Sequence, residues 1–200
     1  VFCIEYIWKK CTNISCCLDK EKEEKGKAKA VQIQYYQSPC GKLILGSFED
    51  KLCMCDWVVS EKRRAAIDKR IQKALNAQYV TENSEVIAKT ISQLDEYFSR
   101  QRIAFDVPLL LVGTEFQKSV WNELQNIPYG TTISYTQLSQ RLNNPKAIRA
   151  VASSNGANSI SILIPCHRVI GSDHKLTGYA GGLTAKKTLL ELESNERRLL

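Results

Sequence analysis

The stretch "SYTQLSQRLNNPKAIRAVASSN", residues 134–155, predicts two short helices joined by the turn "NN". We expect Asn144 to cap the second helix, with Pro145 at its first position, where proline is favoured. Ile148 and Val151 then face the core of their domain. This arrangement is the signature of a helix-turn-helix.

The opposite face of the second predicted helix carries Lys146, Arg149 and Ser153. Small residues flank them: Ala147, Ala150 and Ala152. A face of small residues lets a helix approach another surface closely. An ordinary helical hairpin with a solvated basic residue would show the same pattern, so this segment alone leaves both interpretations open.

The residues upstream predict an antiparallel sheet followed by helices. "VQIQYYQSPCGKLILGSFEDKLCMCDWVVS", residues 31–60, has the pattern of short strands separated by turns, which indicates an antiparallel meander. "SEVIAKTISQLDEYFSR" predicts a helix behind a Ser84 cap. An extended connection broken by Pro108 leads to a domain boundary near Gly113, and Thr114 is expected to cap the next helix.

These patterns together predict an α+β fold. Residues 1–30 are expected to form a flexible, charged extension, because "LDKEKEEKGKAKA" has no apolar stripe. Residues 31–113 would form an N-terminal domain with an antiparallel sheet and helices. Residues 114–200 would form a mostly helical C-terminal domain that contains the helix-turn-helix. A chain of 200 residues, 44% of them hydrophobic, can bury a sizeable core in such domains.

Charge and cysteine content limit the partners and the compartment. The net charge of +7 favours an anionic partner such as nucleic acid. No apolar run approaches the roughly 18 to 20 residues that span a membrane, and charges interrupt the first segment too often for a signal peptide. We therefore expect a cytoplasmic protein, or a nuclear one in a eukaryote, without a membrane partner. Its eight cysteines should be reduced, buried residues and not disulfides.

A metal site is not expected from these cysteines. Cys53 and Cys55 in "LCMCDW" should lie on one face of a strand, and the cysteines near the start lack a C-x-x-C spacing. Only His167 and His174 are available for a mixed site.

The second informative stretch is "IPCHRVI", residues 164–170. The apolar run "ISILI" predicts a buried strand that Pro165 ends, which would place Cys166 in an interior or cleft position. A buried thiol in apolar surroundings is inert, whereas an imidazole can lower its pKa. Adjacency to His167 does not decide between these two cases. A carboxylate such as Glu193 could orient the imidazole in a set of nucleophile, base and orienter.

Five motifs together resemble the O6-alkylguanine-DNA alkyltransferase family, the methylated-DNA-protein-cysteine methyltransferases. They are "GTEFQKSVW", "IPYGTTISY", "RAVASSNGAN", "ILIPCHRVIG" and "TGYAGGLTAKKTLLELE". The resemblance is densest from Thr114 to Glu193 and weaker over the strand-rich region. It implies a ribonuclease H-like N-terminal domain and a winged-helix-like C-terminal domain.

The resemblance also implies a mechanism. Cys166 would accept the alkyl group as a thiolate that His167 generates through a water molecule, with His167 oriented by Glu193 and Asn158. Tyr135 would donate a proton or a strong hydrogen bond to the departing guanine. A thioether is stable to hydrolysis, so each molecule would act once, without a cofactor or metal.

The same resemblance gives a role to the helix-turn-helix. The damaged nucleotide must be flipped out of double-stranded DNA. Arg149 would fill the space it leaves, and the helix would enter the minor groove without reading sequence. The other residues expected to bind DNA or the base are Lys146, Ala147, Ala150, Ser153, Tyr179 and Ala180. We expect a monomer; the range of alkyl groups and activity on O4-alkylthymine stay open.

Two other hypotheses fit parts of the sequence. The protein could be a damaged-DNA recognition protein or transcriptional switch that uses the helix-turn-helix without catalysis. It could also be a Cys-His hydrolase, although no separate oxyanion-hole motif is visible.

Overall fold

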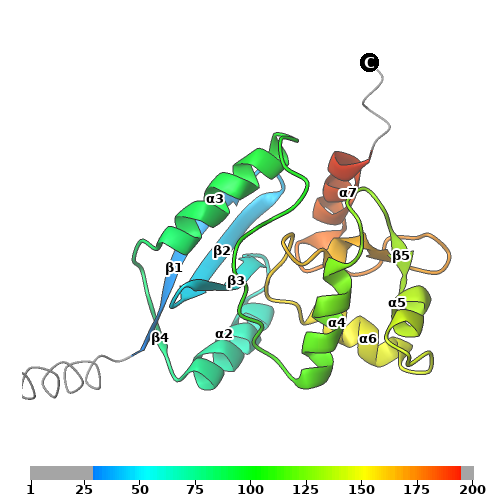
Figure 1. Cartoon of the computed structure of the whole chain (residues 1–200), viewed down its shortest axis with the longest axis horizontal. Helices are drawn as coiled ribbons and strands as arrows, with labels where there is room; N and C mark the ends of the chain where they lie inside the picture. Colours follow the sequence, from blue (N-terminus) through cyan, green and yellow to red (C-terminus); the bar gives the residue numbers. More distant parts are fainter. Residues whose placement is uncertain (1–28, 195–200) are drawn as a thin grey trace, which may run out of the picture.

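The structure is a computed structural model and describes residues 29–194. Its first part is a four-stranded sheet with strand order β3-β2-β1-β4 (Figure 1). The strands are β1 (Ala30–Ser38), β2 (Gly41–Phe48), β3 (Lys51–Trp57) and β4 (Gln78–Val80). Most of the predicted N-terminal extension, residues 1–28, lies outside the described residues.

The predicted antiparallel meander is confirmed for β1, β2 and β3. The sequence did not predict β4, which pairs with β1 in parallel and makes the sheet mixed. The β2–β3 register shifts between Gly46 and Ser47, which pair with Met54 and Leu52, so that Cys53 is the extra residue of a bulge. Cys53 and Cys55 therefore pack in different core clusters, and the expectation that they share one face was wrong.

Two helices cover the opposite faces of the sheet. Helix α3 (Glu85–Phe98) packs with the larger core cluster, and Ser84 caps it as predicted. Helix α2 (Glu61–Leu75) packs Ile67 and Ile71 into the second cluster. The sequence did not predict this helix. Ser60 caps α2 by accepting a hydrogen bond from the Arg63 amide.

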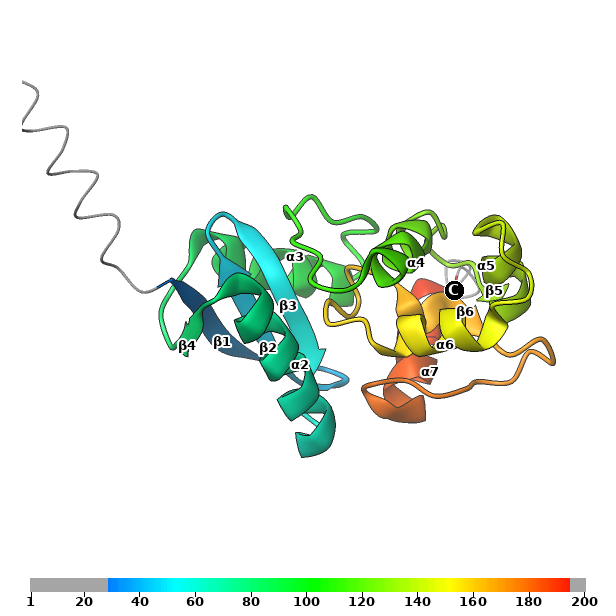
Figure 2. The same cartoon turned by 90° about the horizontal axis from the view of Figure 1, so that it is seen from below.

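The second part of the chain is mainly helical and lies beside the sheet (Figure 2). Its elements are α4 (Glu115–Gln125), β5 (Ile133–Ser134), α5 (Tyr135–Arg141), α6 (Ile148–Gly156), the 3-10 helix η1 (Cys166–Arg168), β6 (Val169–Ile170) and α7 (Gly182–Glu193). Thr114 caps α4 as predicted, in a reciprocal capping box with Gln117. The larger core cluster contains side chains of both parts, so they share one hydrophobic interior.

Helices α5 and α6 form the predicted helix-turn-helix, with corrections at the turn. Asn143 adopts a φ of 53°, a left-handed conformation that asparagine tolerates. Asn144 and Pro145 do not start the second helix, because α6 begins at Ile148 without a side-chain cap. Ile148 is also exposed, whereas Val151 is fully buried as predicted.

The run "ISILI" is buried, but it is not the predicted strand. It folds back on itself through an isolated bridge between Ser161 and Ile164. Ile162 has a φ of 73°, and the Leu163 amide donates to the Ser161 carbonyl at 2.9 Å, as in a γ-turn. The run pairs with the sheet only where Cys55 bridges Ile160. A tight turn therefore precedes Cys166.

Cys40, Cys53, Cys55 and Cys166 are the cysteines in the part of the chain that the structure describes, and all four are free thiols. Between residues 29 and 194, no group of three or more His, Cys, Asp or Glu residues could hold a metal ion. Over the same residues, no helix has the length and apolar character needed to cross a membrane.

Candidate active site

Cys166 lies in the interior of the C-terminal domain, at the start of η1. Its side chain is almost completely buried, and the residue is only 4% exposed. Pro165, with φ −80° and ψ 60°, forms an inverse γ-turn in which the Cys166 amide donates to the Ile164 carbonyl at 2.8 Å. Two successive tight turns therefore fix the thiol.

His167 and Glu193 meet although 26 positions separate them. The imidazole Nε2 lies 2.8 Å from Glu193 Oε1, and both side chains are buried. A carboxylate accepts hydrogen bonds, so Nε2 carries the proton and Nδ1 presents a lone pair. His167 Nδ1 is buried and makes no hydrogen bond to any residue in the described part of the chain. The contact predicted between Glu193 and His167 is thus present.

Glu193 also binds groups whose roles the sequence did not reveal. Arg168 donates to both of its oxygens, at 2.8 and 2.9 Å. Tyr97, which comes from α3 of the N-terminal domain, donates its hydroxyl at 2.7 Å. Arg168 further donates to the Ile127 carbonyl at 2.6 Å. The carboxylate that orients the imidazole is therefore held by both domains.

These contacts set the protonation states of the site. Burial would raise the pKa of Glu193, but hydrogen bonds from His167 and Arg168 outweigh it and lower the pKa to about 2. Burial lowers the pKa of His167, although Glu193 opposes this shift. Burial also raises the pKa of Cys166, against the hydrogen bond from Asn158. The resting site therefore holds a neutral thiol, a neutral imidazole and an ionised carboxylate.

Asn158 contacts the thiol and not the imidazole. Its amide nitrogen lies 3.2 Å from Cys166 Sγ and also donates to the Ile164 carbonyl at 3.1 Å. Its oxygen accepts from the Ile160 amide at 2.9 Å. The expectation that Asn158 orients His167 was therefore wrong, and the amide is instead placed to stabilise negative charge on sulfur.

The predicted base-binding residues lie around this centre. The Tyr179 ring packs edge-on against His167 with centroids 6.3 Å apart, and Ala180 follows it, partly buried. The Tyr135 hydroxyl accepts from the Asn155 amide at 3.4 Å, and the same amide reaches the Cys166 carbonyl at 3.4 Å. Tyr135 is only partly buried, and the Thr177 hydroxyl donates to the same oxygen at 3.5 Å.

The predicted DNA-binding residues share one outer surface on and just before α6. Lys146, Arg149, Ala150 and Ser153 are exposed, and Ala147 is partly exposed. The opposite side of the helix packs Val151 and Ser154 into the domain. The same helix leads, through Asn155 and Asn158, to the residues around Cys166.

The N-terminal domain supplies further residues that the sequence did not indicate. Trp57 donates its indole NH to the Tyr179 hydroxyl at 3.2 Å. A side chain at Gly181 would meet the Trp57 indole at 2.6 Å, so only glycine fits there. The helical spacing of Ile67 and Ile71 behind Ser60 could have revealed α2. No local signal could have revealed the contact of Trp57 with Tyr179.

Fold and site together define a two-domain protein in which a helix-turn-helix is joined to a buried cysteine with an adjoining histidine that a carboxylate holds. Two family models cover most of the chain: "6-O-methylguanine DNA methyltransferase, ribonuclease-like domain" matches residues 31–111, and the DNA binding domain of the same family matches residues 115–195. The chain belongs to the 6-O-methylguanine DNA methyltransferase family.

The chain is similar to known proteins of this family over nearly their full lengths. The "Methylated-DNA--protein-cysteine methyltransferase" of Methanosarcina acetivorans is 42% identical over 160 residues, which are 80% of this chain and 96% of that protein. The protein of the same name from Mycobacterium leprae is 42% identical and covers 83% of this chain and 94% of its own. A crystal structure of Mycobacterium tuberculosis OGT in complex with DNA has a TM-score of 0.68 at 36% identity, covering 82% of this chain and 92% of that chain.

Proposed function

We propose that Cys166 is the residue that accepts the alkyl group in this DNA-repair methyltransferase, in an irreversible reaction that each molecule performs once. The observation that carries the proposal is the arrangement around the sulfur. Asn158 donates to Sγ at 3.2 Å, and the adjoining His167 is held by Glu193 at 2.8 Å with its Nδ1 lone pair unengaged by the described residues. This arrangement supports the roles of nucleophile for Cys166, base for His167 and orienter for Glu193.

His167 is the base in this proposal. Its lowered pKa keeps the imidazole neutral, and Glu193 fixes the tautomer that leaves Nδ1 able to accept a proton. A water molecule between Nδ1 and the thiol would carry the proton. The imidazolium that forms would be stabilised by Glu193, which is itself anchored by Arg168.

The transfer is a single in-line displacement. The Cys166 sulfur supplies the electron pair for a new bond to the carbon attached to O6, and the bond from that carbon to O6 breaks. The thiol proton passes to His167, and guanine takes up a proton from Tyr135 as it departs. The proton held by His167 then restores the Tyr135 hydroxyl through solvent, so that no cofactor enters the balance. The thioether that forms has no route back to a thiol, which makes the reaction stoichiometric.

Tyr135 is the proposed donor to guanine. A neutral base leaves more easily than an anionic one, so a proton or hydrogen bond on the ring lowers the barrier. The hydroxyl of Tyr135, a partly buried residue, is linked through Asn155 to the Cys166 carbonyl, which supports this role. Tyr179 and the backbone of Ala180 would form the wall of the base pocket.

The exposed α6 surface is the proposed contact with double-stranded DNA. The small side chains of Ala147 and Ala150 would allow the helix to enter the minor groove, and Lys146 and Ser153 would contact the backbone. Arg149 would fill the stack after the damaged nucleotide flips, at a cost of a few kcal/mol. We propose that the protein acts as a monomer on O6-alkylguanine in the cytoplasm, or in a eukaryotic nucleus.

A turnover assay with an excess of duplex containing O6-methylguanine tests the proposal. The protein should restore one guanine per chain and then stop. Cys166→Ser should restore none while still binding the duplex, and the control Cys40→Ser, which alters a partly exposed thiol, should behave like the unmodified protein. Repair beyond one equivalent, or full repair by Cys166→Ser, would refute the role of Cys166.

A further inference from the structure

Helix α2 of the N-terminal domain contacts the C-terminal end of α6, and two arginines make the contact. Arg63 donates to the Gly156 carbonyl and, at 2.6 Å, to the Asn158 carbonyl. Arg70 donates to the Ala157 carbonyl at 3.0 Å, and its guanidinium lies over the Trp121 ring at 5.3 Å. Three consecutive carbonyls at the end of the DNA-facing helix are therefore bound from the other domain.

The chemistry of a helix end explains this arrangement. The last carbonyls of a helix lack partners within it and carry the negative end of its dipole, so cations are stabilising there. Two turns of α2 separate Arg63 from Arg70, which puts both guanidinium groups on one face. Asn158 follows the Ala157 cap of α6, and its carbonyl is the third acceptor that these arginines bind.

Arg63 is itself fixed by a buried carboxylate. Asp56, whose side chain is fully buried at the end of β3, accepts from Arg63 Nη2 at 3.0 Å and from Arg63 Nε at 3.3 Å. Arg64 also donates to Asp56, at 3.2 Å, so two cations neutralise one acid. The side chain of Arg63 is only 21% exposed. All three guanidinium nitrogens of Arg63 make hydrogen bonds, so the group has little freedom to move.

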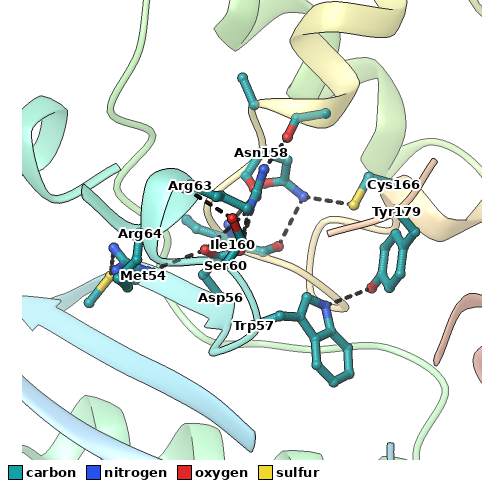
Figure 3. Close-up of polar contacts among 12 residues, drawn as sticks. Met54, Asp56, Trp57, Ser60, Arg63, Arg64, Asn158, Ile160, Cys166 and Tyr179 are labelled. Atoms are coloured by element: carbon teal, nitrogen blue, oxygen red, sulfur yellow. Dashed lines mark hydrogen bonds and ion pairs between the residues drawn. The ribbon is translucent and has the colours of Figure 1, made fainter. Parts of the chain in front are cut away.

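This contact reaches the sulfur through one residue. Arg63 binds the backbone carbonyl of Asn158, and the side-chain amide of Asn158 donates to Cys166 Sγ at 3.2 Å. Figure 3 shows this series of contacts, with Asp56 and Arg63 on one side of Asn158 and Cys166 on the other. The neighbouring backbone is fixed too, because Cys55 of β3 accepts from the Ser161 amide at 2.6 Å.

We infer that Arg63, held by Asp56 and assisted by Arg70, is a positioning residue for alkyl transfer, through which the ribonuclease-like domain sets the place of Asn158 against the acceptor sulfur. The inference rests on Cys166 being the acceptor. The sequence did not predict a functional role for Arg63, Asp56 or Arg70. Arg63 touches neither the base nor the sulfur and acts through Asn158.

The charges around the sulfur support the same role. Burial raises the pKa of Cys166, and Asn158, Arg63 and Lys186 oppose it, whereas Asp56 adds to it. The polar and titratable groups that influence the charge on Cys166 are Cys55, Asp56, Arg63, Asn158, Tyr179 and Lys186. Without Arg63, the negative charge of Asp56 is balanced by Arg64 alone. The Asn158 backbone also loses the hydrogen bond that holds it in place. Both changes disfavour the Cys166 thiolate.

Three arginine variants of the full chain, with free O6-benzylguanine as substrate, test the inference. Arg63→Met should lower the second-order rate constant of Cys166 alkylation by up to about a hundredfold. The pH at which the rate reaches half its maximum should rise. Arg63→Lys should recover part of the rate, because it keeps the charge but not the two-pronged geometry. Arg70→Met frees the Ala157 carbonyl and removes the contact over the Trp121 ring, but it leaves Arg63 bound to Asn158, so it should cause a smaller loss.

Arg102→Met is the matched control. Arg102 is 26% exposed and forms an ion pair with Glu96 at 2.6 Å within the N-terminal domain, so its loss should leave both the rate and the pH profile unchanged. The inference is overturned if Arg63→Met keeps the rate and pH profile of the unmodified protein. It is also overturned if Arg102→Met reproduces the loss. Failure of the unmodified protein to become alkylated at Cys166 would instead overturn the proposed function.

Discussion

Replacing Glu193 by Gln tests the buried network on which the base depends. Glu193 accepts five hydrogen bonds, from Tyr97, His167, the Gly130 amide and two nitrogens of Arg168. Every partner is a donor, so the NH2 of a glutamine would face other donors. The change would also leave the buried Arg168 without its counter-charge. Breaking a buried ion pair in this way costs about 3 to 5 kcal/mol of the free energy of unfolding.

Urea denaturation measures this loss, with Glu191→Gln as the control. Glu191 lies on the same helix, and its side chain is 57% exposed beside Lys187, so its replacement should change the free energy of unfolding by no more than about 0.5 kcal/mol. Adding Arg168→Met to Glu193→Gln should recover part of the loss, because the uncompensated charge is removed. If the free energies of unfolding of Glu193→Gln and Glu191→Gln differ by less than about 1 kcal/mol, the buried ionic network does not stabilise the fold.

The pH dependence of stability gives a second check on Glu193. The pKa of the carboxyl is lowered from 4.5 to about 2 in the folded protein. A lowered folded-state pKa contributes stability that is complete above the unfolded-state pKa and is lost as the pH falls through the folded-state value. The difference in unfolding free energy between the unmodified protein and Glu193→Gln should therefore be constant near neutrality and shrink between about pH 4.5 and 2. A difference that stays constant down to pH 2 would contradict the lowered pKa.

Three further predictions concern DNA and the leaving group. Arg149→Ala should slow transfer on duplex DNA far more than on free O6-benzylguanine, because the free base needs no flipping; equal losses in the two assays would count against that role. Tyr135→Phe should slow both reactions, and an unchanged rate on the free base would remove Tyr135 as the donor. Affinity for duplex DNA should fall as salt rises, because binding releases counterions from phosphates, and a flat response in a binding titration would argue against the proposed surface.

Elements with local chemical signals were predicted well. Thr114 and Ser84 cap their helices as expected. Each cap needs only a side-chain oxygen that accepts from the amide three residues later, and such a local contact can be predicted from the sequence. The helix-turn-helix was found through its apolar spacing, although α6 starts at Ile148 and not after Asn144. Element boundaries depend on tertiary contacts that the spacing does not contain.

The site was less accessible to sequence reasoning, because its contacts are distant along the chain. The run "ISILI" has the composition of a buried strand, but Ile162 is in a left-handed turn, and Cys55 bridges the run only at Ile160. Tyr97 and Arg63 reach the site from the other domain, and no local pattern indicates that they do. His167, Glu193 and Asn158 could be predicted as residues of the Cys166 site, whereas the contact of Arg63 with the Asn158 carbonyl could not.

The most direct test of the account is the mass of the intact protein after incubation with a duplex containing O6-methylguanine, followed by peptide mapping. The account predicts a gain of one methyl group per chain, located on Cys166, with no further gain at longer times. A methyl group on another residue, or a protein of unchanged mass that still binds the duplex, would contradict the claim that Cys166 is the acceptor.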